Sequence, residues 1–490
     1  MIRRRTITSY VWNSVSGNKM VILLNCIRNF FQKFELLGNS VQGENPAPDN
    51  PQEIKSAGRK SKNLFNIADL RVGQVQKDGT INEKSTHYRT AILDVPEDAK
   101  YRITFKTNTD YNMIYFTHAY INGVYSNPYV KVYGGNSNSL ISLKNGKNIL
   151  SFRATKDDAI IGFPKDHNIM IAAESETLDY EPYGYFFDLK ITGKNLFDRE
   201  KARDITNWIV RDGNGYAKFP IRVGKGNKVT FYYSEKLTTG KGFYVGITQS
   251  ETSAIVSWLY HSAETNLNNK KYTAVAAGDY IYLSCTISGI QKFVDTIQTL
   301  QVEIGSEQTE YEPYAEQSMQ IVLDEPLRGV GEYKDTITKD GAVRKIKRAV
   351  FDGSEDEKWG LSREHENHIN FALVIKGAIT VNTGIRTMMD KFKYFGAIWN
   401  SDLLGQDMFG ATLRINMPKT LATDLQTFKT WLSQNPLTVD YVLAEPVTEP
   451  LPESVQAQLS SLHSENGTTH VFVDSGEVEA GINIEYKYKS

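Results

Sequence analysis

Aromatic side chains are concentrated where the sequence could bind a ligand. Residues 111–129 hold five tyrosines and a histidine, with asparagines between them. A Tyr or Trp ring stacks on the apolar face of a sugar, while neighbouring amides bond to its hydroxyl groups. Rings that alternate along strands would instead fill the core of a sandwich, and both interpretations stay open. The candidates for glycan contact, which include two tryptophans further along the chain, are Tyr111, Tyr120, Tyr125, Trp208 and Trp258.

Motifs for catalysis or metal binding are incomplete. His365 and His368 flank a glutamate, but a zinc-protease helix needs its histidines four residues apart on one face. The Gly-Lys-Gly run at 224–226 lacks the spacing of a phosphate-binding loop and is typical of a turn. The acidic pair at 157–158 could serve a glycosidase, whose two carboxylates stand about 5 to 9.5 Å apart, a distance that the sequence does not supply. We therefore expect no catalytic residue, no metal site and no cofactor, and a protein that is not an enzyme.

The charge balance and the cysteine content exclude several classes of protein. Lys+Arg 56 against Asp+Glu 57 gives a net charge of −1, which provides no field to attract nucleic acid or an anionic membrane. The two cysteines, Cys26 and Cys285, are too few for a disulfide framework or a thiolate zinc site. The apolar run at 20–24 is far shorter than the roughly 20 residues of a membrane-spanning helix. We expect no nucleic-acid partner, no membrane insertion and no export signal.

A sequence repeat organises the first two thirds of the chain. Lys-Asn-Leu-Phe begins at Lys62 and again at Lys194, and Tyr-Glu-Pro-Tyr begins at Tyr180 and again at Tyr311. The two markers keep their separation to within one residue, which predicts tandem copies of one module. The two modules are expected at residues 61–191 and 192–322.

Within each module the hydrophobic pattern has the period of strands. Residues 101–105 alternate, and residues 228–232 occupy the equivalent place in the second copy. Turn residues separate many short strands, which predicts a mainly β fold of two-sheet antiparallel sandwiches of jelly-roll type. Further strands are expected at 112–120, 149–153, 159–163, 169–173, 243–248, 272–275, 280–284 and 300–304.

Residues 323–490 are predicted to form a C-terminal α+β domain. Apolar residues recur at helical spacing over 420–434, and Pro436 stops that helix. Trp431 is assigned to the packing of this helix. The elements expected after it are a strand at 437–443, a helix at 453–462 and a final strand at 482–488.

Several of these strings resemble a known group of proteins. Gly-Asn-Ser-Val-Gln at 38–42, with the prolines that follow it, is similar to the first segment of structural proteins from tailed bacteriophages and prophages. The Lys-Asn-Leu-Phe start and Tyr-Glu-Pro-Tyr end resemble the carbohydrate-binding-like jelly-roll modules of their tail and baseplate proteins. Residues 325–333, 428–432 and 443–447 resemble their distal domain, so that the resemblance covers roughly residues 35–490.

This resemblance implies a virion component of the tail or baseplate, made in the bacterial host cytoplasm. Its partners would be other virion structural proteins, further copies of the chain in a homo-oligomer, and a host cell-surface glycan bound by the jelly-roll modules. A head or neck fibre and a glycan-degrading tail enzyme are the alternatives. Modules of this kind also act as spacers.

Residues 1–60 are expected to attach the chain to the particle. Their charges up to Lys33 are all basic, and residues 43–51 are predicted to form an extended strap with three prolines. Such a segment has little core of its own and would gain order from a partner. Its removal is expected to leave a folded remainder that no longer assembles.

Overall fold

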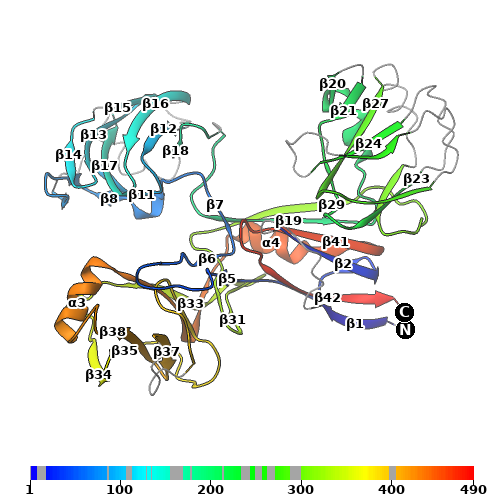
Figure 1. The fold of residues 1–490 in the computed structure, drawn as a ribbon. Coiled ribbons are helices and arrows are strands. Elements are labelled where there is room, and N and C mark those ends of the chain that lie inside the picture. The colour runs from blue at the N-terminus through cyan, green and yellow to red at the C-terminus, as the bar shows by residue number, and fades with distance from the viewer. Residues whose placement is uncertain are drawn as a thin grey trace. The chain divides into compact units, whose positions relative to one another are not determined.

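The computed structural model of the chain is mainly β, with antiparallel sheets, as predicted. Figure 1 draws its two compact units. One consists of Met1–Gly58, Phe187–Ile321 and Leu327–Ser490, and the other of Arg59–Phe186 with Val322–Pro326. The structure describes residues 2–7, 18–84, 88–105, 113–128, 130–133, 135–154, 169–176, 179–211, 214–232, 243–248, 257–261, 271–286, 300–396 and 404–489.

Module 1, drawn in blue and cyan in Figure 1, consists of two antiparallel sheets around one hydrophobic core. Its strands are β8 (Arg71–Val72), β11 (Arg89–Val95), β12 (Ala99–Phe105), β13 (Met113–Ile121), β14 (Val124–Ser126), β15 (Val130–Tyr133), β16 (Gly135–Leu143), β17 (Gly146–Ala154) and β18 (Met170–Ala173). The larger sheet has the order β14-β13-β17-β11-β8, with β15 also paired to β13, and the smaller has the order β16-β12-β18. Ala91, Leu93 and Val95 of β11 point into the core at every second position, as the alternation predicts.

Module 2, drawn in green, has the same plan. Its strands are β20 (Trp208–Arg211), β21 (Asn214–Ala217), β22 (Ile221–Arg222), β23 (Lys228–Tyr232), β24 (Phe243–Thr248), β25 (Ser257–His261), β26 (Lys271–Val275), β27 (Tyr280–Thr286) and β28 (Gln301–Ile304). The larger sheet has the order β20-β21-β27-β24-β25, with β22 also paired to β27, and the smaller has the order β26-β23-β28. The central strand of each smaller sheet, β12 or β23, is one that the sequence pattern predicts. The sequence repeat therefore corresponds to a repeated two-sheet architecture.

The repeated tetrapeptides close each module on itself. The side-chain nitrogen of Asn63 donates to the carbonyls of Ile169 and Glu181, at 3.0 and 3.1 Å. Its side-chain oxygen accepts from the backbone N–H groups of Phe65 and Ile171, at 2.9 and 3.0 Å. Because an amide both donates and accepts, one side chain joins the first segment, the last strand and the closing tetrapeptide. In module 2 Asn195 makes the equivalent bonds to the backbone of Phe197, Val302 and Glu312.

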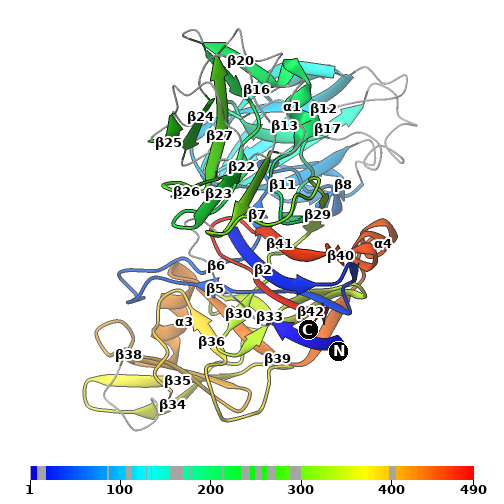
Figure 2. The same cartoon turned by 90° about the vertical axis from the view of Figure 1, so that its right-hand side faces the viewer.

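A further sheet joins strands from both ends of the chain. Its strands are β1 (Ile2–Ile7), β2 (Asn18–Cys26), β4 (Lys33–Leu37), β19 (Tyr185–Thr192), β29 (Glu316–Leu323), β32 (Thr336–Thr338), β33 (Gly341–Phe351), β36 (Thr387–Met389), β39 (Leu437–Glu449), β41 (Gly467–Asp474) and β42 (Gly481–Lys489). Their order is β29-β19-β41-β2-β42-β4-β32-β33-β39-β36, with β1 also paired to β42 and a further short strand, β7 (Arg59–Lys60), paired to β19. Module 2 is thus inserted between β19 and β29. Figure 2 shows β2, in blue, beside β41 and β42, in red.

The expectation that residues 1–60 have little core of their own is wrong. Strand β2 lies between β41 and β42, and β4 pairs with both β42 and β32. Leu23 and Leu36 have no exposed surface, and Cys26 is also buried. The partner strands β32, β41 and β42 follow about 300 to more than 400 residues later, so the composition of the segment alone did not reveal them. Residues 42–51 do form an irregular strap, with one isolated bridge between Ala47 and Asn50.

The C-terminal region contains both helices that the sequence predicts. Helix α3 (Leu425–Gln434) begins later than expected, because the side chain of Asp424 caps it and accepts from the Thr427 N–H at 2.8 Å. Helix α4 (Glu453–Ser461) agrees with the predicted helix at 453–462. Beside α3 lies a sheet of order β34-β35-β38-β37. Its strands are β34 (Gly360–Glu364), β35 (His368–Val374), β37 (Gly405–Phe409) and β38 (Thr412–Pro418).

The strand predictions agree with the structure at most positions within the described residues. The expected strand at 159–163 lies outside the described residues. Sequence analysis missed very short strands such as β8, β14 and β22, because two or three residues carry no measurable period. It also missed two longer strands of module 1, β11 and β16.

Candidate functional site

Tyr120 and Tyr125 are brought together by a tight hairpin in module 1. Strands β13 and β14 are joined by Asn122 and Gly123, whose φ values of 46° and 82° suit a two-residue turn with a left-handed backbone. The register places Tyr120 directly opposite Tyr125. Side chains opposite each other in an antiparallel pair lie on the same face of the sheet, so the two tyrosines are neighbours there. Both rings are half-buried.

A β-bulge in β13 places the side chain of His118 on the same face of the sheet as Tyr120. The register against β17 shifts between Phe116 and His118, which leaves Thr117 as the extra residue. Phe116 and Ala119 consequently both face the core, without any exposed surface. His118 and Tyr120 therefore lie on the outer face of the larger sheet.

Five side chains form a cluster on this outer face, and we call Gln74, Tyr88, His118, Tyr120 and Tyr125 the aromatic cluster. The Tyr88 ring meets the His118 ring edge-on, with centroids 5.4 Å apart and an interplanar angle of 82°. The Tyr125 ring lies 6.2 Å from His118, at 42°. The cluster is held from one side by the hairpin of β9 (Gln74–Val75) and β10 (Ile81–Asn82).

Hydrogen bonds fix the imidazole within the aromatic cluster. The Gln74 amide nitrogen lies 2.6 Å from His118 Nε2, and Thr117 Oγ1 lies 2.7 Å from His118 Nδ1. An amide nitrogen can only donate, so Nε2 accepts and the ring proton sits on Nδ1, which donates to the Thr117 hydroxyl. These two bonds hold the His118 ring in place within the cluster.

The turn between β9 and β10 packs against the Tyr120 ring at Gly79. A Cβ atom at Gly79 would lie 2.8 Å from Tyr120 Cε1, and the φ of Gly79 is +83°. Both the close approach and the left-handed backbone favour glycine here. The ring of Tyr120 therefore rests on the backbone of the turn.

The chemistry of the aromatic cluster suits recognition. It combines half-buried phenol rings with an amide and an imidazole, the groups that stack on a sugar ring and bond to its hydroxyls. Within the described residues, no group of three or more His, Cys, Asp or Glu side chains could hold a metal ion. Burial raises the pKa of the Cys26 thiol to about 12, so that this thiol is protonated and unreactive at neutral pH.

The other predicted site residues do not join this cluster. Tyr111 lies outside the described residues, as does the side chain of Trp258, although its backbone belongs to β25. Trp208 is only 6% exposed, and its indole N–H donates to the Ala202 carbonyl at 2.9 Å. Trp208 fills the core of module 2 and presents no face to a ligand, which corrects the expectation for this residue.

Sequence analysis missed Gln74 and Tyr88, which precede the tyrosine-rich stretch. Their place in the aromatic cluster depends on pairing between strands that are distant in sequence, and no local pattern signals it. Trp431 belongs to helix α3, and its ring packs against the ring of Phe392, with centroids 6.1 Å apart. However, Trp431 also lines a cavity of about 570 Å³ and is only partly buried.

A comparison of the chain with models of known protein families gave no match, and neither did a comparison with curated proteins. Within the described part of the chain, no helix is both long and apolar enough to cross a bilayer.

Proposed function

We propose that the protein is a structural component of a tailed-phage or prophage virion that adheres to a host-surface glycan. The virion part of this proposal is supported by two resemblances to tail and baseplate proteins. One is that of the motifs at the ends of the two modules, and the other is that of residues 325–333, 428–432 and 443–447. The adhesion is non-covalent and is carried by module 1. Other virion proteins and further copies of the chain are its partners in the particle.

The observation that carries the proposal is the aromatic cluster of module 1. Tyr120 and Tyr125 stand side by side on one face of a rigid hairpin, and Gln74 and His118 supply polar groups beside them. Side chains held by strands and a tight turn lose little entropy when a ligand binds. A single site of this kind binds weakly, so useful adhesion requires many copies acting together.

Binding of the full chain to purified host-wall polysaccharide tests the proposal. Tyr125→Ala removes a stacking surface and is expected to weaken binding about tenfold, because aromatic contacts contribute about 0.5 to 1.5 kcal/mol each. Tyr180→Ala is the matched control, because Tyr180 is also a tyrosine of module 1, is 43% exposed and lies outside the aromatic cluster. Calorimetric titration measures the affinity, and the thermal unfolding midpoint checks that each variant is folded.

Equal affinity of the Tyr125→Ala variant and the wild type would overturn the assignment of the aromatic cluster. The glycan-degrading alternative rests on the acidic pair at 157–158, which lies outside the described residues. Incubation of the same polysaccharide with the protein separates the two functions. Adhesion predicts that no reducing ends are released, whereas a depolymerase would release them.

A further inference from the structure

A cavity of about 690 Å³ lies where the two ends of the chain meet strand β29. Its walls come from β3 (Asn29–Phe30), from β29 and from the end of α4 with β40 (His463–Ser464). The side chains that matter for its chemistry are Arg28, Phe30, Gln317, Met319, Leu462 and His463. Its volume falls within the roughly 300 to 1,000 Å³ of small-molecule sites.

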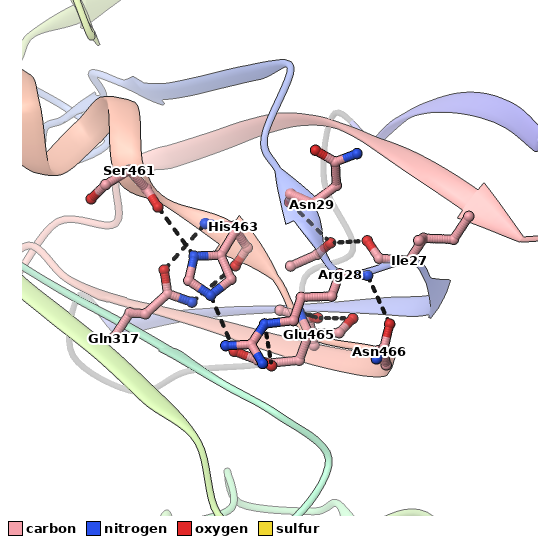
Figure 3. A network of polar contacts seen from close by, with 10 residues as sticks. Ile27, Arg28, Asn29, Gln317, Ser461, His463, Glu465 and Asn466 are labelled. Carbon is pink, nitrogen blue, oxygen red and sulfur yellow. Dashed lines mark hydrogen bonds and ion pairs between the residues drawn. The ribbon is translucent and has the colours of Figure 1, made fainter.

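Hydrogen bonds hold the walls of this cavity in place (Figure 3). The Gln317 amide nitrogen donates to the His463 carbonyl at 3.0 Å, and the His463 N–H donates to the Gln317 amide oxygen at 3.2 Å. The Arg28 N–H donates to Asn466 Oδ1 at 2.9 Å, and the Ser464 hydroxyl donates to the Ile27 carbonyl at 2.7 Å. These bonds connect three segments that are distant in sequence, so the cavity is preformed.

One wall of the cavity is an exposed aromatic ring. Phe30 is 60% exposed, and its ring meets the His463 ring edge-on, with centroids 6.1 Å apart and an interplanar angle of 81°. The pairing of β3 with β40 fixes this position. Phe30 therefore presents an apolar face that no other described part of the chain covers fully, beside the apolar Met319 and Leu462.

The rim of the cavity carries an exposed arginine that is paired with a carboxylate. The Arg28 side chain is 61% exposed, and its Nε forms an ion pair with the Glu465 carboxylate at 3.6 Å. Glu465 itself is mostly buried and also lies 3.5 Å from His463 Nε2. Among the described residues that line the cavity, the charged side chain is Arg28, and none is acidic.

The ring of His463 is held in this wall by contacts with the protein. Its Nδ1 lies 3.1 Å from the Ser461 carbonyl, to which it donates, and its Nε2 faces the Glu465 carboxylate. Both ring nitrogens are thus directed at acceptors of the protein, so neither is placed to activate a nucleophile. The arrangement suits binding of a ligand without chemical change.

We propose that this cavity binds a saccharide that carries a carboxylate, such as a hexuronate unit. The apolar face of the sugar ring stacks on Phe30, and the carboxylate meets Arg28, whose planar guanidinium matches its geometry. Asn29 and Gln458 also line the cavity, and their side-chain amides would bond to the sugar hydroxyls. This is a second site, separate from the aromatic cluster of module 1, and it does not depend on that cluster.

Titration of the full chain with glucuronate and with glucose tests the proposal. The wild type is expected to bind glucuronate about tenfold more tightly than glucose, because a hydrogen bond to a charged group is stronger than one to a neutral group. Arg28→Gln is expected to remove this preference, and Phe30→Ala to weaken the binding of both sugars. Arg203→Gln is the matched control, because Arg203 is also an exposed arginine, at 53%, but lies in α1 (Arg199–Arg203).

Equal affinity of the wild type for the two sugars would overturn the proposal, as would an Arg28→Gln variant that keeps the preference. Tyr125→Ala separates the two sites, since it is expected to weaken the binding of both sugars at module 1 and to keep the preference for glucuronate that Arg28 provides. Loss of glucuronate binding in Tyr125→Ala, with retention in Phe30→Ala, would assign the acidic sugar to module 1 and contradict this inference. The thermal unfolding midpoint of each variant shows that binding is compared between folded proteins.

Discussion

The side-chain amide of Asn63 satisfies four backbone groups inside module 1, and Asn195 occupies the same place in module 2. Both residues are 2% exposed. Without this amide the four groups would be buried without partners, which costs free energy for each of them. The requirement explains why asparagine stands at the same point of both sequence repeats.

Replacement of either asparagine tests its role in closing the module. Asn63→Ala and Asn195→Ala are each expected to lower the free energy of unfolding by about 3 kcal/mol, since buried unpaired groups cost about 1 to 3 kcal/mol each. Scanning calorimetry measures the shift. Asn66→Ala is the control, because its side chain makes an exposed bond to Asp69. Midpoints like that of the wild type in both closing variants would contradict this role.

His470 gives the stability of the larger unit a dependence on pH. It is completely buried, its Nδ1 lies 3.0 Å from the Gly193 carbonyl, and burial lowers its pKa from 6.5 to about 4. Below pH 6.5 the unfolded chain takes up a proton on this imidazole that the folded protein excludes until about pH 4. The free energy of unfolding therefore falls as the pH drops through this window, by up to about 3 kcal/mol.

Substitution of this histidine isolates its contribution. His470→Gln has no group that titrates in this window, so its unfolding free energy is expected to fall less than that of the wild type between about pH 7 and about pH 4. Chemical denaturation at several pH values measures the slope. Tyr125→Phe serves as the control and is expected to keep the wild-type slope. A His470→Gln variant with that same slope would refute the assignment.

At the level of elements, the sequence pattern predicted strands β12 and β23 but did not predict strand β2. The alternation at 101–105 and 228–232 predicted β12 and β23 because a sandwich strand buries every second residue against its own module. Strand β2 could not be assigned in this way, because its apolar residues are covered by β41, which follows more than 400 residues later. A local window contains no information about such a partner.

Two adjacent leucines of β2 test whether this strand belongs to the core. Leu23 is fully buried and Leu24 is 57% exposed. Leu23→Ala is expected to lower the free energy of unfolding by about 2 to 5 kcal/mol, because it opens a cavity, whereas Leu24→Ala changes it by less than about 0.5 kcal/mol. Urea denaturation of the full chain measures both. Similar small effects for the two variants would mean that β2 is not part of the core.

At the scale of the whole molecule, the candidate sites are assembled from segments that no motif connects. Tyr120 and Tyr125 were predicted because they lie within one tyrosine-rich stretch, but Gln74 and Tyr88 reach them only through the folded sheet. Trp208 was misjudged, because an indole and its N–H can be satisfied inside a core as readily as on a surface. The cavity beside Phe30 is lined by residues from both ends of the chain and from β29, so it exists only in the folded protein.

The proposed virion role can be tested by a density map of the intact phage or prophage particle from the host that makes this chain. We expect the chain in the tail or baseplate in several copies, with the face of module 1 that carries Tyr120 and Tyr125 open to solvent. Clear density for the chain at the head or neck would contradict the tail assignment. Absence of the chain from the particle, or burial of that face against a neighbouring protein, would contradict its role as a virion adhesin.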